Sequence, residues 1–118
     1  MSTATLYGIP TCDTVKKARA WLDAHGVAYT FHDFKKAGIE HAMVESWLRD
    51  VPWEVLVNRK GTTWRALPDA RKAAIIDAAS ATALMLESSS VVKRPVLQFA
   101  GRTHVGFSTQ LYEELFNH

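Results

Sequence analysis

The first third of the chain alternates between strand-like and helix-like hydrophobic patterns. Residues 4–7 alternate in polarity and stop at a glycine and a proline, which is typical of a short strand. Apolar residues then recur at helical spacing and predict a helix over residues 14–25, stopped by Gly26. Residues 27–34 are rich in aromatic and β-branched side chains and predict a second strand, followed by a loop over residues 35–38. Two strands joined by one helix form a βαβ unit, so we expect them to be parallel.

The middle of the chain has helical periodicity with interruptions. One apolar stripe predicts a helix over residues 39–48, and a shorter helical piece follows over residues 53–58. Residues 59–65 are mostly polar and predict a loop, although they include a tryptophan. An alanine-rich segment predicts a helix over residues 69–79, and Ser80 is a candidate cap for a further helical turn. The tryptophans of this region are expected in the core, because tryptophan is highly buried on average.

Strand character returns in the last third. Residues 96–99 and 103–106 flank a tight turn and predict a β-hairpin. Ser108 is placed to cap a final helix, with Phe107 and Tyr112 at the spacing of a hydrophobic staple. The complete order is therefore βαβ, several helices, then ββα, within one domain of 118 residues.

Composition and charge exclude several classes of protein. A single cysteine rules out an internal disulfide framework, and the first residues show neither a basic leader nor an apolar export signal. We therefore expect a cytoplasmic protein. No apolar run is long enough to cross a membrane, and a net charge of +2 without long basic runs gives no reason to expect nucleic acid as a partner. The five histidines show no ligand spacing with the cysteine or with one another, so no metal site is expected.

Cys12 is the residue on which the functional interpretation depends. It precedes the predicted first helix, with Asp13 or Thr14 as the expected N-cap, and Lys16 and Lys17 follow within one turn. Exposed backbone N–H groups and the positive end of the helix dipole favour a thiolate at such a position. A lone cysteine is, however, usually a small buried hydrophobic residue, so its placement alone leaves a reactive and a structural role equally open.

Five segments of the chain form a recognisable set: residues 7–18, 31–36, 56–65, 93–96 and 105–108. Taken in this order they resemble the arsenate-reductase-related family (ArsC/Spx/YffB), and the glycine-threonine-threonine-tryptophan-arginine run of the third segment is most similar to the YffB branch. The resemblance implies an α/β fold of the thioredoxin-like (glutaredoxin-like) type. This fold has a four-stranded mixed sheet, with a helical insertion over approximately residues 40–90 between strands 2 and 3.

The resemblance also implies a site around Cys12 as the catalytic nucleophile. Pro95 is expected to be cis, and Arg94 is expected to lie near the sulfur and hold a carboxylate or oxyanion. Val15 occupies the position of a second, resolving cysteine, so an oxidised Cys12 must be cleared by an outside thiol. Glutathione is the obvious cytosolic candidate. The expected substrate-binding and glutathione-binding residues are Thr11, Lys16, Arg59, Arg94 and Pro95.

These observations favour an enzyme, a glutathione-dependent monothiol oxidoreductase that acts on an oxidised thiol substrate, binds no resident cofactor and works as a monomer. One alternative is a glutathione-coupled arsenate reductase. The family's oxyanion-binding arginines are only partly matched, because Asn58 stands at the middle position with Arg59 beside it, and Gly106-Phe107 stands at the third. The other alternative is a non-catalytic, Spx-like regulator that binds RNA polymerase. The missing second cysteine disfavours a redox-switched regulator of this kind.

Overall fold

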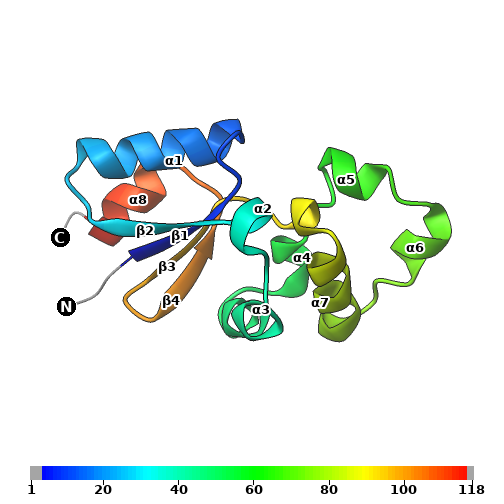
Figure 1. The fold of residues 1–118 in the computed structure, drawn as a ribbon. Coiled ribbons are helices and arrows are strands. Elements are labelled where there is room, and N and C mark those ends of the chain that lie inside the picture. Colours follow the sequence, from blue (N-terminus) through cyan, green and yellow to red (C-terminus); the bar gives the residue numbers. More distant parts are fainter. Residues whose placement is uncertain (1–3, 117–118) are drawn as a thin grey trace. The chain divides into compact units, whose positions relative to one another are not determined.

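A four-stranded sheet carries the first and last parts of the chain in the computed structural model, which describes residues 4–116 (Figure 1). Its strands are β1 (Ala4–Gly8), β2 (Tyr29–Asp33), β3 (Val96–Phe99) and β4 (Arg102–Val105). They lie in the order β2-β1-β3-β4; β1 and β2 are parallel, and the β1–β3 and β3–β4 pairs are antiparallel. The mixed sheet and the βαβ…ββα order predicted from the sequence are confirmed.

The register places two sets of loops at opposite ends of this sheet. Gly8 pairs with Asp33, and Tyr7 pairs with Val96, so the ends of β1 and β2 lie beside the start of β3. The β3–β4 turn lies at the other end, where Ala100 and Gly101 both have positive φ (55° and 77°). The loop that follows β1 and the segment that precedes β3 therefore meet at one end of the sheet.

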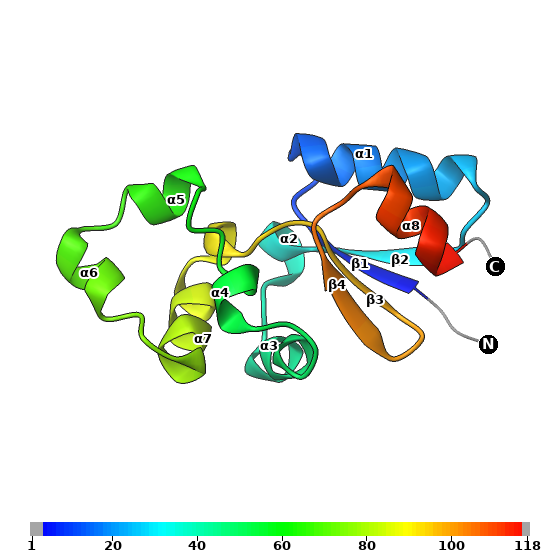
Figure 2. The ribbon, with the colours of Figure 1, turned by 180° about the vertical axis from the view of Figure 1, so that it is seen from behind.

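Two helices, α1 (Asp13–Ala24) and α8 (Thr109–Phe116), cover one face of the sheet (Figure 2). The helical stripe predicted for the first of them is the buried one. Ser108 Oγ accepts a hydrogen bond from Leu111 N at 3.1 Å and caps α8, as predicted. The buried residues of this core are Ala4, Leu6, Ala18, Trp21, Leu22, Leu97 and Tyr112.

Tyr112 lies at the centre of the aromatic side of this core. Its ring makes edge contacts with Phe107 at a centroid distance of 4.7 Å and with Trp21 at 5.6 Å. The Phe107 contact is the predicted hydrophobic staple. The whole side chain is buried, and among residues 4–116 its hydroxyl oxygen has no hydrogen-bond partner. Burial raises the pKa of the Tyr112 phenol far above its usual value.

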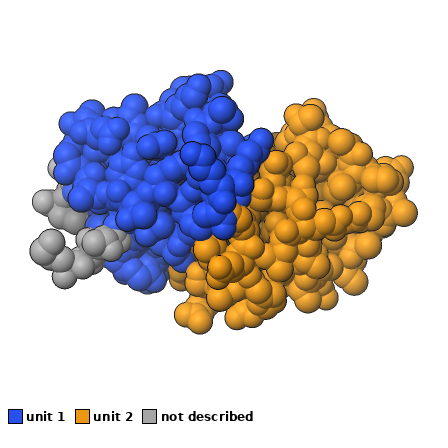
Figure 3. Space-filling view, viewed as in Figure 1, with its two compact units in different colours: residues 1–37, 94–118 blue, residues 38–93 orange. Residues whose placement is uncertain are grey.

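Residues up to Ala37 and from Arg94 onward form one compact unit, and Gly38–Lys93 form a second (Figure 3). The second unit is helical, as expected for the insertion, and buries Trp47 completely, whereas Trp53 and Trp64 are only partly buried. Its elements are α3 (His41–Leu48), α4 (Trp53–Leu56), α5 (Thr62–Arg65), α6 (Asp69–Ala73), α7 (Ala78–Glu87) and the 3₁₀ helix η1 (Ser89–Val91). Lys93 N donates to Leu56 O at 2.8 Å and ties the end of the unit to α4.

Three sequence predictions are wrong in local detail. The predicted loop over residues 35–38 is mostly a short helix, α2 (Phe34–Ala37), because Asp33 Oδ1 accepts the N–H of Lys35 at 2.8 Å and closes a helical turn. The predicted loop over residues 59–65 contains α5, whose first turn is closed by the 3.1 Å bond from Arg65 N to Gly61 O.

The third error is the helix predicted over residues 69–79, which breaks after Ala73 and restarts at Ala78. Asp77, not Ser80, is the N-cap of α7: its carboxylate accepts Ser80 N at 2.8 Å, and Ser80 Oγ accepts Asp77 N at 3.1 Å. This reciprocal pair is a capping box, and it starts a new helix where alanine content alone predicts continuation. No helix within residues 4–116 is both long and apolar enough to cross a membrane.

Candidate functional site

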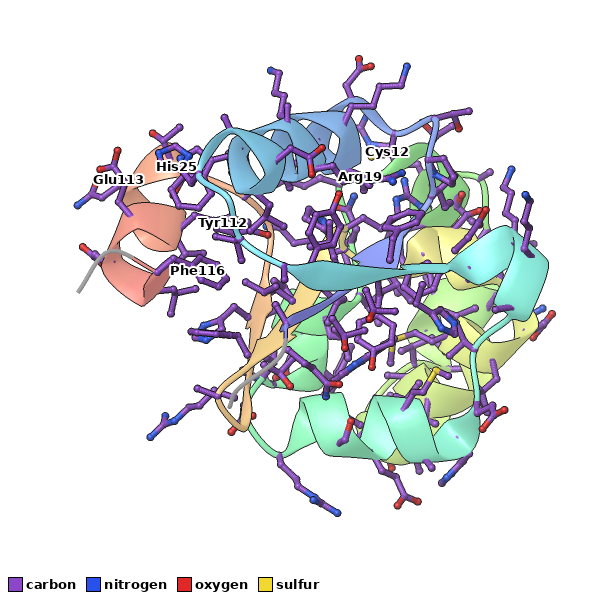
Figure 4. The ribbon with its side chains drawn as sticks, turned by 60° about the vertical axis from the view of Figure 1, so that its left-hand side comes forward. Cys12, Arg19, His25, Tyr112, Glu113 and Phe116 are labelled. Carbon is purple, nitrogen blue, oxygen red and sulfur yellow. The ribbon has the colours of Figure 1, made fainter. Side chains whose placement is uncertain are left out.

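Cys12 lies at the start of α1, in the loop that follows β1 (Figure 4). Cys12 N donates to Ile9 O at 3.0 Å, which closes a turn, and Cys12 O accepts Lys16 N at 2.9 Å as the first bond of the helix. With φ −73° and ψ 126°, Cys12 itself is therefore the N-cap. The prediction of Asp13 or Thr14 as the cap is wrong, because the turn closes one residue earlier and both residues are already helical.

The surroundings of the Cys12 sulfur favour the thiolate. Burial of this half-exposed side chain raises its pKa, but the backbone N–H of Val15, the Arg94 side chain and the N–H of Thr14 together lower the pKa of Cys12 below its ordinary value. These two N–H groups belong to the first turn of α1, whose positive end also favours a thiolate at Cys12.

Arg94 and Pro95, from the last third of the sequence, lie at the same end of the sheet as the loop that follows β1. They directly precede β3, whose first residue pairs with Tyr7 near the end of β1. The Arg94–Pro95 peptide bond is cis, as the family resemblance implies. The Arg94 guanidinium is within hydrogen-bonding reach of Cys12, and the Nε atom of Arg94 is buried. The structure thus brings together three of the residues predicted for the site: Cys12, Arg94 and Pro95.

Gly8 allows α1 to start close to the end of β1. A Cβ atom at this position would lie 2.7 Å from Val15 Cγ2 and 3.3 Å from Val15 Cγ1. Val15 is fully buried, so its side chain has little room to move away. Its backbone φ is not in the left-handed region, so the absence of a side chain, not conformational freedom, is what the position requires. In the sequence Gly8 is recognisable only as a turn signal, because its packing partner Val15 lies seven residues later, on the buried stripe of the helix.

Gly8→Ala is expected to lower the free energy of unfolding by about 1–3 kcal/mol, because the added methyl group overpacks against Val15. Urea unfolding followed by circular dichroism measures the change. In a Val15→Ala background the same substitution is expected to cost much less, since the clashing methyl groups are gone. An equal cost in both backgrounds would show that the contact with Val15 is not the cause.

Of the other predicted site residues, Thr11 and Lys16 lie in this unit, and both are exposed. Thr11 directly precedes the nucleophile, and Lys16 lies one helical turn after it on the same side of α1. Arg59 belongs to the second unit, where its guanidinium lies over the Trp53 ring, 5.7 Å from the centroid. There it lines a surface cavity of about 270 Å³ with Lys60 and Lys93. Its role near Cys12 stays a prediction.

Within residues 4–116 no group of three or more His, Cys, Asp or Glu side chains is arranged so that it could hold a metal ion. The groups that the structure places at this site are the sulfur, the guanidinium and the helix-start amides. Together these groups can stabilise a thiolate and position an anionic or polar group beside it.

Residues 7–115 match the ArsC family. A solved structure described as a YFFB protein is 49% identical, with a TM-score of 0.90, over 95% of this chain and 97% of that one. An arsenate reductase (ArsC) related protein from Brucella melitensis is 51% identical, with a TM-score of 0.76, over 98% and 96% of the two chains. The global transcriptional regulator Spx of Streptococcus agalactiae is 25% identical over 88% of this chain and 76% of its own length. The chain therefore belongs to the ArsC family and has its thioredoxin-like fold.

Proposed function

We propose that the protein is a glutathione-dependent monothiol oxidoreductase with Cys12 as its nucleophile. The Cys12 thiolate attacks one sulfur of a disulfide, forms a mixed disulfide and releases the other half as a thiolate. A glutathione thiolate then attacks the mixed disulfide, takes over the bound group and restores the Cys12 thiolate. Each cycle consumes one glutathione thiolate, releases one substrate thiolate and leaves a mixed disulfide of glutathione, or glutathione disulfide where the bound group is itself glutathionyl. Complete reduction of another disulfide to two thiols takes a second glutathione, which supplies the two electrons together with the first and leaves as glutathione disulfide.

One observation supports the proposal most directly: the only cysteine of the chain is accessible, and its pKa is lowered by Arg94 and the helix-start amides. A structural cysteine in an apolar environment has the opposite properties, with a buried sulfur and a raised pKa. The same observation explains why an external thiol is needed. This sequence contains no second thiol that could resolve a mixed disulfide.

The remaining residues of the proposed site act on the bound group. Arg94 stabilises the thiolate before the attack, and its forked donors are suited to a carboxylate of the incoming peptide. The backbone beside Pro95 is the proposed partner for the extended main chain of that peptide. Lys16 and Thr11 are exposed at the start of α1, where the charge of Lys16 is proposed to attract anionic disulfides.

Incubation with glutathione disulfide tests the proposal. The expected result is a mass increase of one glutathionyl group, which is then released by an excess of reduced glutathione. Because Cys12 is the only thiol of the sequence, the mass increase assigns the adduct to Cys12. Protein alkylated beforehand with iodoacetamide is the control. A thiol that forms no adduct at pH 7–8 while remaining accessible to iodoacetamide would contradict the proposal.

The second candidate activity is reduction of arsenate, for which the Arg94 guanidinium beside the sulfur is the favourable observation. Glutathione consumption that depends on arsenate would support it, measured with a protein that also forms the glutathione adduct. A Spx-like binding role predicts instead that capture of RNA polymerase persists in Cys12→Ala. These measurements separate the three functions. The oxidoreductase reacts with a disulfide and glutathione in the absence of arsenate, the arsenate reductase consumes glutathione only when arsenate is present, and the regulator needs no thiol at residue 12.

A further inference from the structure

Arg19 lies on the same side of α1 as Cys12, two turns further along the helix (Figure 4). Seven residues correspond to 700° of rotation, so the two positions differ by only about 20° around the axis. The rise between them is about 10 Å. Lys16 lies between them on the same side, and a helical side chain leans toward the N-terminus, which for Arg19 is the direction of Cys12.

The guanidinium of Arg19 is held in place by the edge strand β2. Its Cζ atom lies 4.1 Å from the centroid of the Phe31 ring, and its Nε donates a hydrogen bond to the Tyr29 hydroxyl at 3.1 Å. Stacking and this hydrogen bond fix the plane of the group and occupy only one of its nitrogens. Among residues 4–116 the two terminal nitrogens, which form the fork that binds a carboxylate, make no such contact and are left to other partners.

No carboxylate of the described residues pairs with Arg19. Asp23 lies one turn further along α1, yet the ion pairs found within residues 4–116 are His41–Glu45 and Arg71–Glu87. An arginine that is half-buried, oriented by an aromatic ring and a phenol, and without an acidic partner in the described part of the chain is preorganised for an anionic ligand.

From this geometry we propose that Arg19 binds a carboxylate of the glutathionyl group that is transferred to Cys12, and so selects anionic disulfides. The inference rests on the proposed function and adds a residue that makes the protein selective for negatively charged substrates. Arg19 takes no part in bond making or breaking, and Arg94 remains the residue that acts on the sulfur.

The dimensions of the ligand fit this arrangement. An extended peptide advances about 3.3–3.6 Å per residue, and the γ-glutamyl arm of glutathione places its α-carboxylate roughly two to three residue lengths from the cysteine, or about 7–10 Å. The rise from Cys12 to Arg19 is about 10 Å, and the flexible disulfide linkage adds to the reach. A glutathionyl group lying along α1 can therefore bring its carboxylate to the fork of Arg19.

The test compares rates of mixed-disulfide formation with two symmetric disulfides, glutathione disulfide (anionic) and bis(2-hydroxyethyl) disulfide (uncharged). Arg19→Met, which keeps an apolar stem over Phe31, is expected to slow the reaction with glutathione disulfide about 3- to 10-fold, the effect of one charge-assisted hydrogen bond at a partly exposed site. The reaction with the uncharged disulfide is expected to stay within about twofold of wild type, since no carboxylate is involved. Arg19→Lys keeps the positive charge but lacks the forked donors, so its rate with glutathione disulfide should fall between those of wild type and Arg19→Met.

Arg102→Met is the matched control, because Arg102 is exposed at the hairpin end of the sheet, away from Cys12. It should change neither rate. Equal slowing with both disulfides in Arg19→Met, or no slowing with either, would overturn the role of Arg19 while leaving the thiol chemistry of Cys12 intact. A wild-type protein that reacts with neither disulfide would overturn the proposed function, and this inference with it.

Discussion

Arg94→Met is expected to move the pH midpoint of Cys12 alkylation upward and to slow adduct formation at pH 7 about tenfold. The direction follows from the charge: Arg94 helps to lower the pKa of Cys12, so removing it raises the pKa and reduces the thiolate fraction at neutral pH. Hydrogen bonds to charged groups contribute about 1.5–3 kcal/mol, and the lower end, which applies to a half-exposed sulfur, corresponds to about tenfold in rate.

The measurement is the rate of iodoacetamide alkylation between pH 5 and 10, with loss of the thiol followed by intact mass. Arg102→Met again serves as the control for the loss of one positive charge from the sheet. The contribution of the α1 start should survive in Arg94→Met, because the amides of Thr14 and Val15 are unchanged. If Arg94→Met leaves the alkylation profile of the wild type in place, Arg94 does not act on the sulfur, and the proposed site loses its cation.

Tyr112→Ala is expected to lower the free energy of unfolding by about 3–5 kcal/mol, a large part of the 5–15 kcal/mol typical of a domain. The reason is the cavity left among Trp21, Phe107 and Leu97 in the core between the sheet and its two helices. Tyr112→Phe is the matched variant. It keeps the ring and removes a buried hydroxyl that has no partner among residues 4–116, so we expect it to be neutral or stabilising.

The pH dependence of stability provides a second readout for Tyr112. Since burial raises its pKa in the folded state, the proton is bound more tightly in the folded than in the unfolded chain. Stability is therefore full below the unfolded-state pKa of about 10 and falls as the pH rises above it. Tyr112→Phe should make this alkaline decline shallower, with the buried Tyr7 accounting for part of what remains. A Phe variant that is less stable than wild type at pH 7 would instead show that the hydroxyl is satisfied in solution.

The strands and the first and last helices follow from the sequence because each carries its own start and stop signals. Gly26, which has φ 66° in the structure, ends α1 where predicted, and Ser108 caps α8. Two of the errors fall where a short polar side chain decides the backbone conformation. Asp33 begins α2, and Asp77 with Ser80 divides one alanine-rich segment into two helices. Such local side-chain to backbone hydrogen bonds leave no trace in the spacing of hydrophobic residues, so hydrophobic periodicity alone does not predict them.

The sequence predicts the type of site, a thiol at a helix start, better than it predicts the tertiary contacts around it. The position of Cys12 before an amphipathic helix favours a thiolate but leaves a structural role open. The proximity of Arg94 was expected only from the family resemblance, because it depends on a strand pairing that joins residues about ninety positions apart. The packing of Gly8 against Val15 and the contacts of Arg19 with β2 are likewise tertiary. Periodicity identified the buried face of α1 correctly. It gave no reason to choose Arg19 from among the polar residues on its other face.

The division of the chain into two units has a consequence for biosynthesis. β1 is an inner strand whose neighbours are β2 and β3, and β3 begins at Val96, after the whole of Gly38–Lys93 has been translated. At translation speeds of about 5–20 residues per second, the inner strand waits several seconds on the ribosome with one edge unpaired. Arg94 leaves the ribosome with the same late segment, so a nascent chain carries its nucleophilic sulfur well before the cation that activates it.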